Sequence, residues 1–357
     1  MLRFLSFLIL LISINLELNA QIRNAPLTRN DMESAAQNYQ KYCALCHGKD
    51  RQGNAADYAP SLRSNSLMST MTLNFLASSI AFGRANTPMA AYVKDYGGPL
   101  NMKEIFTLAS WLKYESGAET IDLGDGAITG DLWNGAYLYA QECIKCHGKK
   151  GEGITAPALA NASFLAFATD EYIKYAIVNG RDGSKMNGFK EILTEKETND
   201  ITAYIRSLAS GWSKEPKKLV PYPGPENYVL NPNGKDPSFH LIDGRYAPMK
   251  EVMEAIQNKN KMIILDTRTS SEWHNAHIPG AVPIPYYVEE KDVDKGLTDK
   301  STWIIAYCAC PHAASDTVID MLRKKGYKNT AVINEGFFGW INAGYPISAG
   351  EVNDPEN

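Results

Sequence analysis

The chain has 357 residues, of which 44% are apolar and 21% are charged. That composition is ordinary for a globular protein, and the length predicts two or three domains rather than one. The formal net charge is −4 and the sequence has no long basic run, which together argue against nucleic-acid binding.

The N-terminus has the pattern of a secretory signal. Arg3 precedes an apolar stretch from Phe4 to Ile14 that is too short to span a bilayer, and Ala20 supplies a small residue at the cleavage point. We expect residues 1–20 to be removed, which gives a periplasmic or otherwise exported protein with no transmembrane span in the mature chain. The alternative is a retained N-terminus that associates the protein with a membrane.

An internal repeat occupies residues 28–118 and 126–213. Each copy opens with an amphipathic helical pattern, Met32 to Tyr42 or Leu132 to Glu142, that runs into a Cys-x-x-Cys-His unit. An Ala-Pro-x-Leu segment, a helical stretch ending in Gly-Arg, a methionine and a closing helix follow. The residues at matching positions include Tyr39 and Tyr139, Ala35 and Gly135, Arg84 and Arg181, and Trp111 and Tyr204. Each copy is expected to be a small all-α domain.

The two Cys-x-x-Cys-His units have the attachment signature of c-type haem. Two thiols three residues apart lie on one helical turn, so each can form a thioether to one haem while the adjacent histidine faces the iron. We expect two covalently bound haem c groups. The thioether residues are Cys43, Cys46, Cys143 and Cys146, and the proximal iron ligands are His47 and His147. Zinc would need a second ligand pair nearby, and a redox dithiol would normally lie on a βα unit.

A sixth ligand decides whether each iron is closed for electron transfer or open for chemistry. Met89 and Met186 follow their haem units by similar distances and are the expected ligands. The alternative is that either methionine only fills the core. The competing methionines in the first copy are Met68, Met71 and Met102. The carbonyls of Pro60 and Pro157 are candidates to accept the imidazole N–H of the proximal histidines, unless both are plain turn prolines.

With these residues the two copies resemble mono-haem class I cytochrome c domains in tandem, over about Asp31 to Gly117 and Asp131 to Ser210. The resemblance implies a helix–haem–helix fold, one-electron shuttling between six-coordinate irons and one or more redox partner proteins. Haem propionates would add negative charge, which favours a basic partner. Di-haem thiosulfate dehydrogenases are also similar, but they use a cysteine iron ligand, and neither copy has a further cysteine.

The pattern changes after the repeat. Residues 214–240 carry six prolines and predict an extended, semi-rigid linker. Short apolar strands follow at Met262 to Asp266, Trp303 to Tyr307 and Thr330 to Ile333, with a helix from about Ser315 to Lys325. This alternation predicts an α/β domain over residues 241–350. The expected fold class is therefore multidomain, with two small all-α domains followed by an α/β domain.

The third domain resembles a rhodanese domain over about Leu241 to Ala349. The segments that carry the resemblance are Leu265 to Arg268, Glu272, His277 to Ala281, Ile304 to Cys308, and Gly336 to Trp340. In that family a cysteine ends a central strand and opens a loop whose amides stabilise thiolate and persulfide, and the resemblance gives this role to Cys308. The loop here lacks the usual glycine and arginine and is one residue longer, so ordinary thiosulfate sulfurtransferase activity is not expected.

The residues that replace the usual loop offer other chemistry. Cys310 is a candidate to resolve a persulfide on Cys308 or to form a strained disulfide with it, and His312 to lower a thiol pKa or carry a proton. Alternatively, the three residues bind a soft metal such as copper(I) or zinc, or the domain is inactive and serves for docking. Trp273, His274 and His240 are given no chemical role, the first two in a loop.

Two functions follow from these expectations. In the first, an exported di-haem cytochrome couples electron transfer to sulfur or thiol chemistry, as a sulfur-compound or thiol oxidoreductase or a sulfurtransferase-like enzyme. Its substrate would be a small sulfur compound or a protein thiol, oxidised at Cys308. In the second, the protein is only an electron carrier, and its third domain recruits a partner. The sequence leaves open whether the chain is an enzyme.

Overall fold

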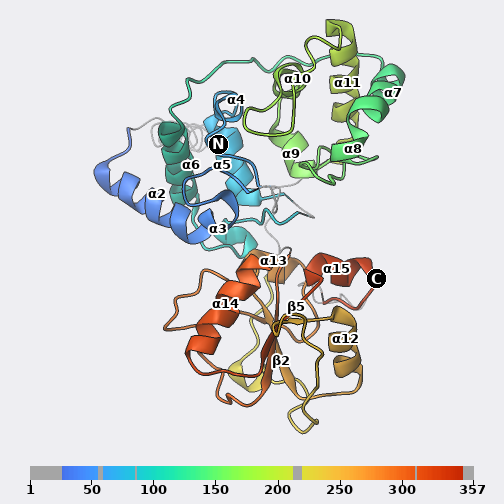
Figure 1. Ribbon diagram of the computed structural model, residues 1–357. Helices are drawn as coiled ribbons and strands as arrows, with labels where there is room; N and C mark the ends of the chain where they lie inside the picture. Colours follow the sequence, from blue (N-terminus) through green and yellow to red (C-terminus); the bar gives the residue numbers. More distant parts are fainter. Residues whose placement is uncertain (1–25, 55–58, 85–86, 212–218, 310–311, 349–357) are drawn as a thin grey trace, which may run out of the picture.

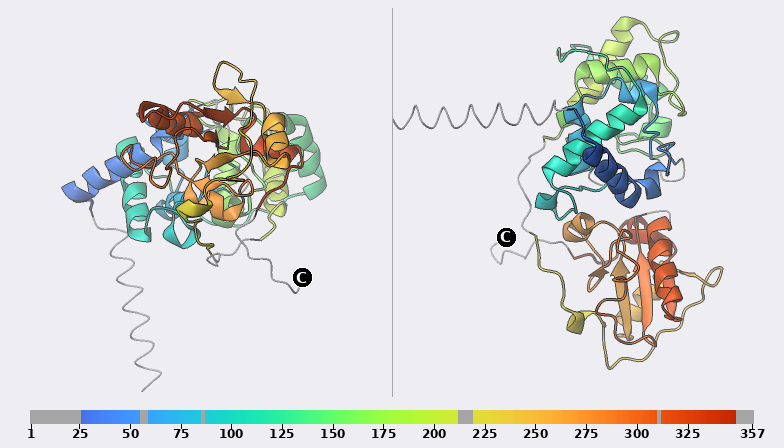
Figure 2. Two further views of the ribbon diagram at one scale, coloured as in Figure 1. Left: turned by 90° about the horizontal axis from the view of Figure 1, so that it is seen from below. Right: turned by 90° about the vertical axis from the view of Figure 1, so that its left-hand side faces the viewer.

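The computed structural model describes residues 26–54, 59–84, 87–211, 219–309 and 312–348 (Figure 1). The expected signal peptide and Cys310 lie outside these residues. A helical region lies on one side of the molecule and an α/β domain on the other, and the right-hand view of Figure 2 shows the same separation. Across the described ranges, none of the helices is both long and apolar enough to pass through a membrane.

The helical region is built from two similar domains. Domain 1 contains α2 (Arg29–Tyr42), α3 (Ala44–His47), α4 (Asn65–Met68), α5 (Leu73–Phe82), the 3₁₀ helix η1 (Lys94–Tyr96) and α6 (Met102–Ser116). Domain 2 contains α7 (Leu132–Glu142), α8 (Ile144–His147), α9 (Ala162–Phe167), α10 (Asp170–Asn179) and α11 (Glu195–Ser207). The all-α prediction is confirmed for both copies of the repeat.

The first and last helices of each domain pack against one another. In domain 1 the ring of Tyr39 lies 5.5 Å from that of Trp111, and in domain 2 Tyr139 lies 5.3 Å from Tyr204. At the crossing in domain 2, a Cβ on Gly135 would come within 2.1 Å of the carbonyl oxygen of Asp200. A small residue is therefore required for the close approach of α7 and α11.

The α/β domain is a five-stranded parallel sheet in the order β1-β5-β4-β2-β3. Its strands are β1 (Tyr246–Ala247), β2 (Met262–Asp266), β3 (Val282–Pro283), β4 (Trp303–Tyr307) and β5 (Thr330–Ile333). Its helices are α12 (Met249–Gln257), α13 (Ser270–Asn275), α14 (Ala313–Lys324) and α15 (Gly336–Asn342). Because all strands run the same way, their carboxyl ends share one edge of the sheet.

Apolar residues alternate along the strands, which gives the sheet a core on both faces. Ile264 and Ile305 belong to the cluster on the side of α12 and α15, whereas Ile263 and Ile304 belong to the cluster that includes residues of α14. Both faces of a parallel sheet are normally covered in this way. The predicted helix near Ser315 is confirmed as α14, and Gly326 follows it with φ +94°.

The structure adds contacts to the expected linker and corrects one expected loop. Residues 219–240 contain the 3₁₀ helix η2 (Pro225–Asn227), and the Leu230 N–H donates to Met262 O at 2.8 Å, so this stretch lies along the sheet. Trp273 and His274 are not in a loop but in α13, where they are 4% and 7% exposed. The loop expectation was wrong because α13 has only six residues, too few for helical periodicity to be visible; a Thr269–Glu272 capping box starts it.

Candidate haem sites and the Cys308 loop

Both Cys-x-x-Cys-His units have the same backbone conformation. In each unit the first cysteine ends the opening helix and begins the next short one. The Cys46 and His47 N–H groups donate to Cys43 O at 3.2 and 2.9 Å, and the equivalent bonds to Cys143 O have the same lengths. The two thiols of each unit therefore lie on one turn, as attachment to a single haem requires.

The proximal histidines are oriented by backbone carbonyls. His47 Nδ1 lies 3.0 Å from Pro60 O, and His147 Nδ1 lies 2.9 Å from Pro157 O. A carbonyl oxygen only accepts, so Nδ1 carries the proton and Nε2 is left with its lone pair for a metal. The predicted contacts with Pro60 and Pro157 are confirmed. Burial lowers the pKa of both imidazoles, which also favours the neutral form that binds iron.

The first cysteine of each unit is not suited to dithiol exchange. Burial raises the pKa of Cys43 to about 12 and that of Cys143 to about 11. Dithiol exchange uses the thiolate, which such values disfavour. Among the described residues, no group of three or more histidine, cysteine or acidic side chains could hold a metal ion, so the site fits a covalent haem better than zinc or a redox disulfide.

The loops that carry Met89 and Met186 are folded alike. The Arg84 N–H donates to Met89 O at 2.7 Å, and the Arg181 N–H donates to Met186 O at 2.9 Å. Thr87 Oγ1 and Ser184 Oγ accept from the methionine amides at 3.2 and 3.0 Å. Both loops thus present a methionine at the same place in the repeat. The part of these methionines as iron ligands stays a prediction.

The competing methionines occupy other settings. Met68 is fully buried and Met71 is 6% exposed, and both belong to the core cluster of domain 1. Met102 is 38% exposed in the first turn of α6. Met186 is the one methionine of residues 126–213, so none of these three has a methionine counterpart in domain 2.

Two family models together match most of the described helices and strands. The model for cbb3-type cytochrome c oxidase subunit III matches residues 30–112 and 130–205, and the model for rhodanese-like domains matches residues 249–343. The chain contains two cytochrome c domains followed by a rhodanese-like domain. Electron transfer is therefore the function of the helical region, and its cytochrome c relatives imply covalently bound haem c.

Three similar proteins illustrate the two parts. A cbb3-type cytochrome c oxidase subunit FixP of Bradyrhizobium sp. (strain ORS 278) is 28% identical over 179 residues, 47% of this chain and 58% of the relative. A subunit CcoP of Cereibacter sphaeroides is 23% identical over 56% of this chain and 68% of its own length. A thiosulfate sulfurtransferase structure from Pseudomonas aeruginosa is 23% identical, covers 30% of this chain and 21% of its own, and has a TM-score of 0.28. The chain thus spans little more than half of the FixP relative.

In the rhodanese-like domain, Cys308 directly follows β4 and is 4% exposed. Its carbonyl accepts the Phe337 N–H at 2.8 Å, which ties the start of the loop to the first turn of α15. Gly336 approaches the same carbonyl with φ +62°, and a Cβ there would lie 3.0 Å from it. The cysteine is therefore held at the carboxyl edge of the sheet, where the family places its reactive residue.

His312 lies at the same edge but towards β1 and β5. Its Nε2–H donates to Asn334 O at 2.5 Å, and its ring centroid is 4.3 Å from that of Tyr246. Nδ1 is therefore the nitrogen left to exchange a proton. Cys310 lies outside the described residues, so the structure does not place it relative to Cys308 or His312.

A buried arginine that the sequence did not single out for a function follows β2 at the carboxyl edge of the sheet. Arg268 Nη2 is 2.6 Å from Asp266 Oδ2, and its guanidinium carbon lies 3.8 Å from the ring centroid of Phe337. Burial alone would lower the pKa of Arg268, but the carboxylates of Asp266 and Glu272 outweigh it and raise the pKa. Since Arg268 is committed to these partners, it does not replace the arginine missing from the loop.

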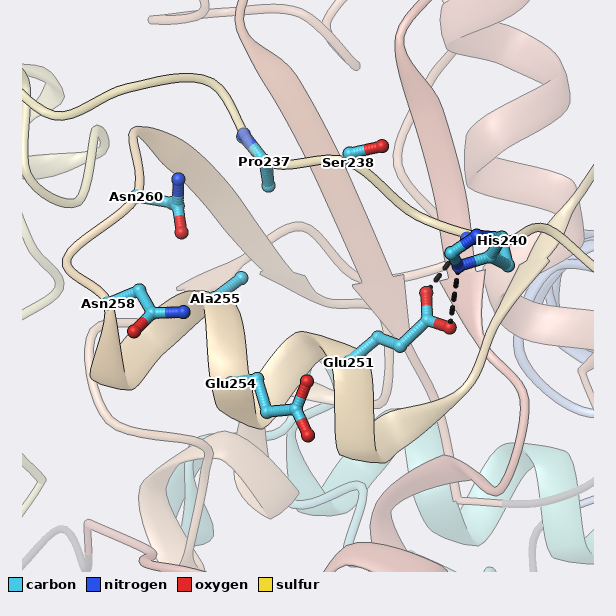
Figure 3. A pocket seen from close by; sticks show the side chains of 8 residues that line it. All are labelled: Pro237, Ser238, His240, Glu251, Glu254, Ala255, Asn258 and Asn260. Carbon is cyan, nitrogen blue, oxygen red and sulfur yellow. Dashed lines mark hydrogen bonds and ion pairs between the residues drawn. The ribbon is translucent and has the colours of Figure 1, made fainter.

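A surface groove of the rhodanese-like domain runs along α12 (Figure 3). It is lined by Pro237, Ser238, His240, Glu251, Glu254, Ala255, Asn258 and Asn260. Asn260 lies just before β2, whereas Cys308 follows the carboxyl end of β4, the parallel neighbour of β2. The backbone N–H of His240 donates to Glu251 Oε2 at 2.8 Å, and its ring Nδ1 lies 3.2 Å from Glu251 Oε1. The groove is therefore separate from the Cys308 loop.

Proposed function

We propose that the protein is an exported di-haem cytochrome that couples electron transfer to sulfur or thiol chemistry at Cys308. The observation that carries this proposal is the orientation of the rhodanese-like sheet. Its carboxyl edge, where Cys308 begins its loop, is also the edge that contacts domain 1, where the Ser271 hydroxyl donates to Ala91 O at 2.6 Å. A thiol that is to deliver electrons to a haem should lie on this side.

Each cytochrome domain would hold one haem. Cys43, Cys46 and His47 in domain 1, and Cys143, Cys146 and His147 in domain 2, supply the thioethers and the proximal ligand. Met89 and Met186 supply the sixth ligands. When bound, each haem provides one centre that accepts one electron. Pro60 and Pro157 accept from Nδ1 of His47 and His147, so each Nε2 would be free to ligate the iron of its own haem.

Oxidation at Cys308 releases two electrons, which is the number that the two haem centres together accept. Joining its sulfur to the sulfur of a second thiol breaks two S–H bonds, forms one S–S bond and releases two protons and two electrons. The second thiol is that of a small sulfur compound, of a protein or of Cys310. Nδ1 of His312 is the proposed proton acceptor.

A second function is supported by the loop itself. It lacks the family's glycine and arginine, and Arg268 is held by Asp266. In this alternative the rhodanese-like domain does no chemistry and recruits a redox partner for an electron carrier. Under either function we propose that the chain is exported and has a basic redox partner. A retained N-terminus would associate it with a membrane.

The experiment that separates the two functions is reduction of the oxidised protein by sulfur donors. Sulfide, thiosulfate, sulfite and a small persulfide are supplied in turn while the haem α-band is recorded, with wild type beside Cys308→Ala. We expect at least one donor to reduce wild type faster than the variant. Equal rates with every donor would contradict sulfur chemistry at Cys308. In that case, deletion of residues 241–357 should leave the haem potentials intact and weaken binding to one redox partner.

A further inference from the structure

A continuous path of bonds leads across the sheet edge from Cys308. The residue before it, Tyr307, accepts the Thr267 N–H on its carbonyl oxygen at 3.0 Å. The carbonyl oxygen of Thr267 in turn accepts the Tyr286 N–H at 2.9 Å. Two hydrogen bonds therefore connect the cysteine to Tyr286, which lies just beyond β3.

Tyr286 carries the path into domain 1. Its hydroxyl donates to Tyr42 O at 2.6 Å, and Tyr42 directly precedes Cys43, the first haem-attachment cysteine. The Tyr92 hydroxyl lies 3.0 Å from the same carbonyl and 2.9 Å from the Tyr286 hydroxyl. Cys308 and Cys43 are thus joined by covalent bonds and three hydrogen bonds, with no jump through space.

The surroundings make this a built interface. Burial raises the pKa of Tyr92 and Tyr286 well above the ordinary value, so both hydroxyls stay protonated and able to donate. The ring of Tyr287 packs edge-on against Tyr42 with centroids 5.0 Å apart. At the rim, Lys41 Nζ lies 2.6 Å from Glu289. An aromatic centre with a charged rim is typical of a specific protein interface.

Domain 2 lacks the groups that make this contact. Glu142 stands before its first haem cysteine, where domain 1 has Tyr42. Phe189 takes the place of Tyr92: its N–H donates to Ile177 O at 2.9 Å, as the Tyr92 N–H donates to Ile80 O at 3.1 Å. A phenylalanine has no hydroxyl to offer. Among the described residues, the hydrogen bonds and the ion pair between the rhodanese-like domain and the cytochrome region involve domain 1.

We propose that Tyr286 is a positioning residue that couples the Cys308 loop to the haem site of domain 1. Electrons released at Cys308 then enter the chain at domain 1, which leaves domain 2 to serve the external partner. The electron-entry part rests on the proposed function. The docking part does not, because it concerns only how the rhodanese-like domain is attached.

The test compares Tyr286→Phe with Tyr287→Phe in the full-length, haem-loaded protein. The second variant is the matched control, because the Tyr287 hydroxyl pairs with Ser270 of its own domain at 3.1 Å. Tyr92→Phe, which installs the residue of domain 2, is a further variant. Two quantities are measured: hydrogen exchange of the amides of residues 43–47, and the rate of haem reduction by the sulfur donor that is active on wild type.

Tyr286→Phe should speed exchange of these amides by about tenfold, the fold-change expected for the loss of one buried hydrogen bond. It should also slow donor-driven reduction. Tyr92→Phe should have a smaller effect, and Tyr287→Phe should match wild type. Reduction by dithionite should not differ among the variants. Exchange equal to that of Tyr287→Phe would overturn the docking role, and an unchanged donor rate would overturn entry at domain 1. If no sulfur donor reduces wild type, the proposed function and electron entry fail together, while the exchange data still decide the docking role.

Discussion

The carboxylate of Asp182 in domain 2 accepts a hydrogen bond from the Ser64 hydroxyl of domain 1 at 2.9 Å. The Ser66 and Asn65 amides donate to it as well, at 2.7 and 2.9 Å. Burial opposes ionisation of Asp182, but these bonds outweigh it and lower its pKa to about 2 from 3.8. One ionised side chain therefore clamps the two cytochrome domains together.

This clamp predicts a pH-dependent stability. Because the folded pKa lies below the unfolded value, the contribution of Asp182 is present above pH 3.8 and is lost as the pH falls towards 2. Asp182→Asn should lower the thermal midpoint above pH 4 and flatten its dependence in the acid window. The measurement is unfolding followed by circular dichroism from pH 2.5 to 7, with the exposed Asp125→Asn as control. Parallel curves for wild type and Asp182→Asn would contradict the clamp.

The duplicated haem units predict that each haem attaches to its own unit whether or not the other haem is present. Wild type should contain two haems per chain, measured as the pyridine haemochrome. Cys43→Ala combined with Cys46→Ala should leave one, and so should Cys143→Ala combined with Cys146→Ala. The haem that remains should stay attached on a denaturing gel, since thioether bonds survive unfolding. Loss of both haems from either double variant, in protein that is still folded, would contradict independent sites.

The methionine loops predict a shift in potential. Thioether ligation raises the potential of a haem, so Met89→Ala and Met186→Ala should each lower the potential of one haem and open that iron to carbon monoxide. Met102→Ala, which changes an exposed competitor, should leave both potentials and both irons unchanged. Spectroelectrochemical titration and carbon monoxide difference spectra provide the readout. An effect of Met102→Ala alone would transfer the ligand role to that residue.

Glu272 predicts a pH dependence of the opposite sign. Burial raises its pKa to about 7 from 4.5, against the lowering effect of Arg268. The folded pKa lies above the unfolded one, so this contribution is full below pH 4.5 and is lost as the pH rises to about 7. The rhodanese-like domain should therefore gain stability on mild acidification, and Glu272→Gln should remove that gain. The exposed Glu254→Gln should behave as wild type, and a gain that persists in Glu272→Gln would refute the assignment.

The helix crossing in domain 2 predicts a steric cost. Gly135→Ala would place a Cβ 2.1 Å from Asp200 O, and such overpacking destabilises a protein by about 1–3 kcal/mol. In domain 1 the matching Ala35 is fully buried and accommodated, so Ala35→Gly should cost less, about 1 kcal/mol from lost helix propensity. Chemical denaturation of the two variants measures the difference. Equal losses of unfolding free energy in the two variants would mean that α7 and α11 move apart to accommodate the added methyl group.

The parts of the structure that follow from local spacing were predictable. The Cys-x-x-Cys-His turns are local, and the carbonyl contacts of Pro60 and Pro157 join residues only 13 and 10 positions apart. Arg268 was visible as a motif residue, but its burial depends on contact with Phe337, which is distant in sequence. Tyr286 and Tyr42 are 244 positions apart, and no periodicity in the sequence predicts a contact between residues so far apart.

The contact between Tyr286 and Tyr42 also has a kinetic consequence. A rhodanese-like protein and a cytochrome that are separate must find each other by diffusion, and any exchange between them slows as either becomes dilute. Here the two are tethered and docked, so each sees the other at a fixed effective concentration. Transfer within the chain should therefore be first order and independent of how much protein is present, even in a crowded or dilute compartment.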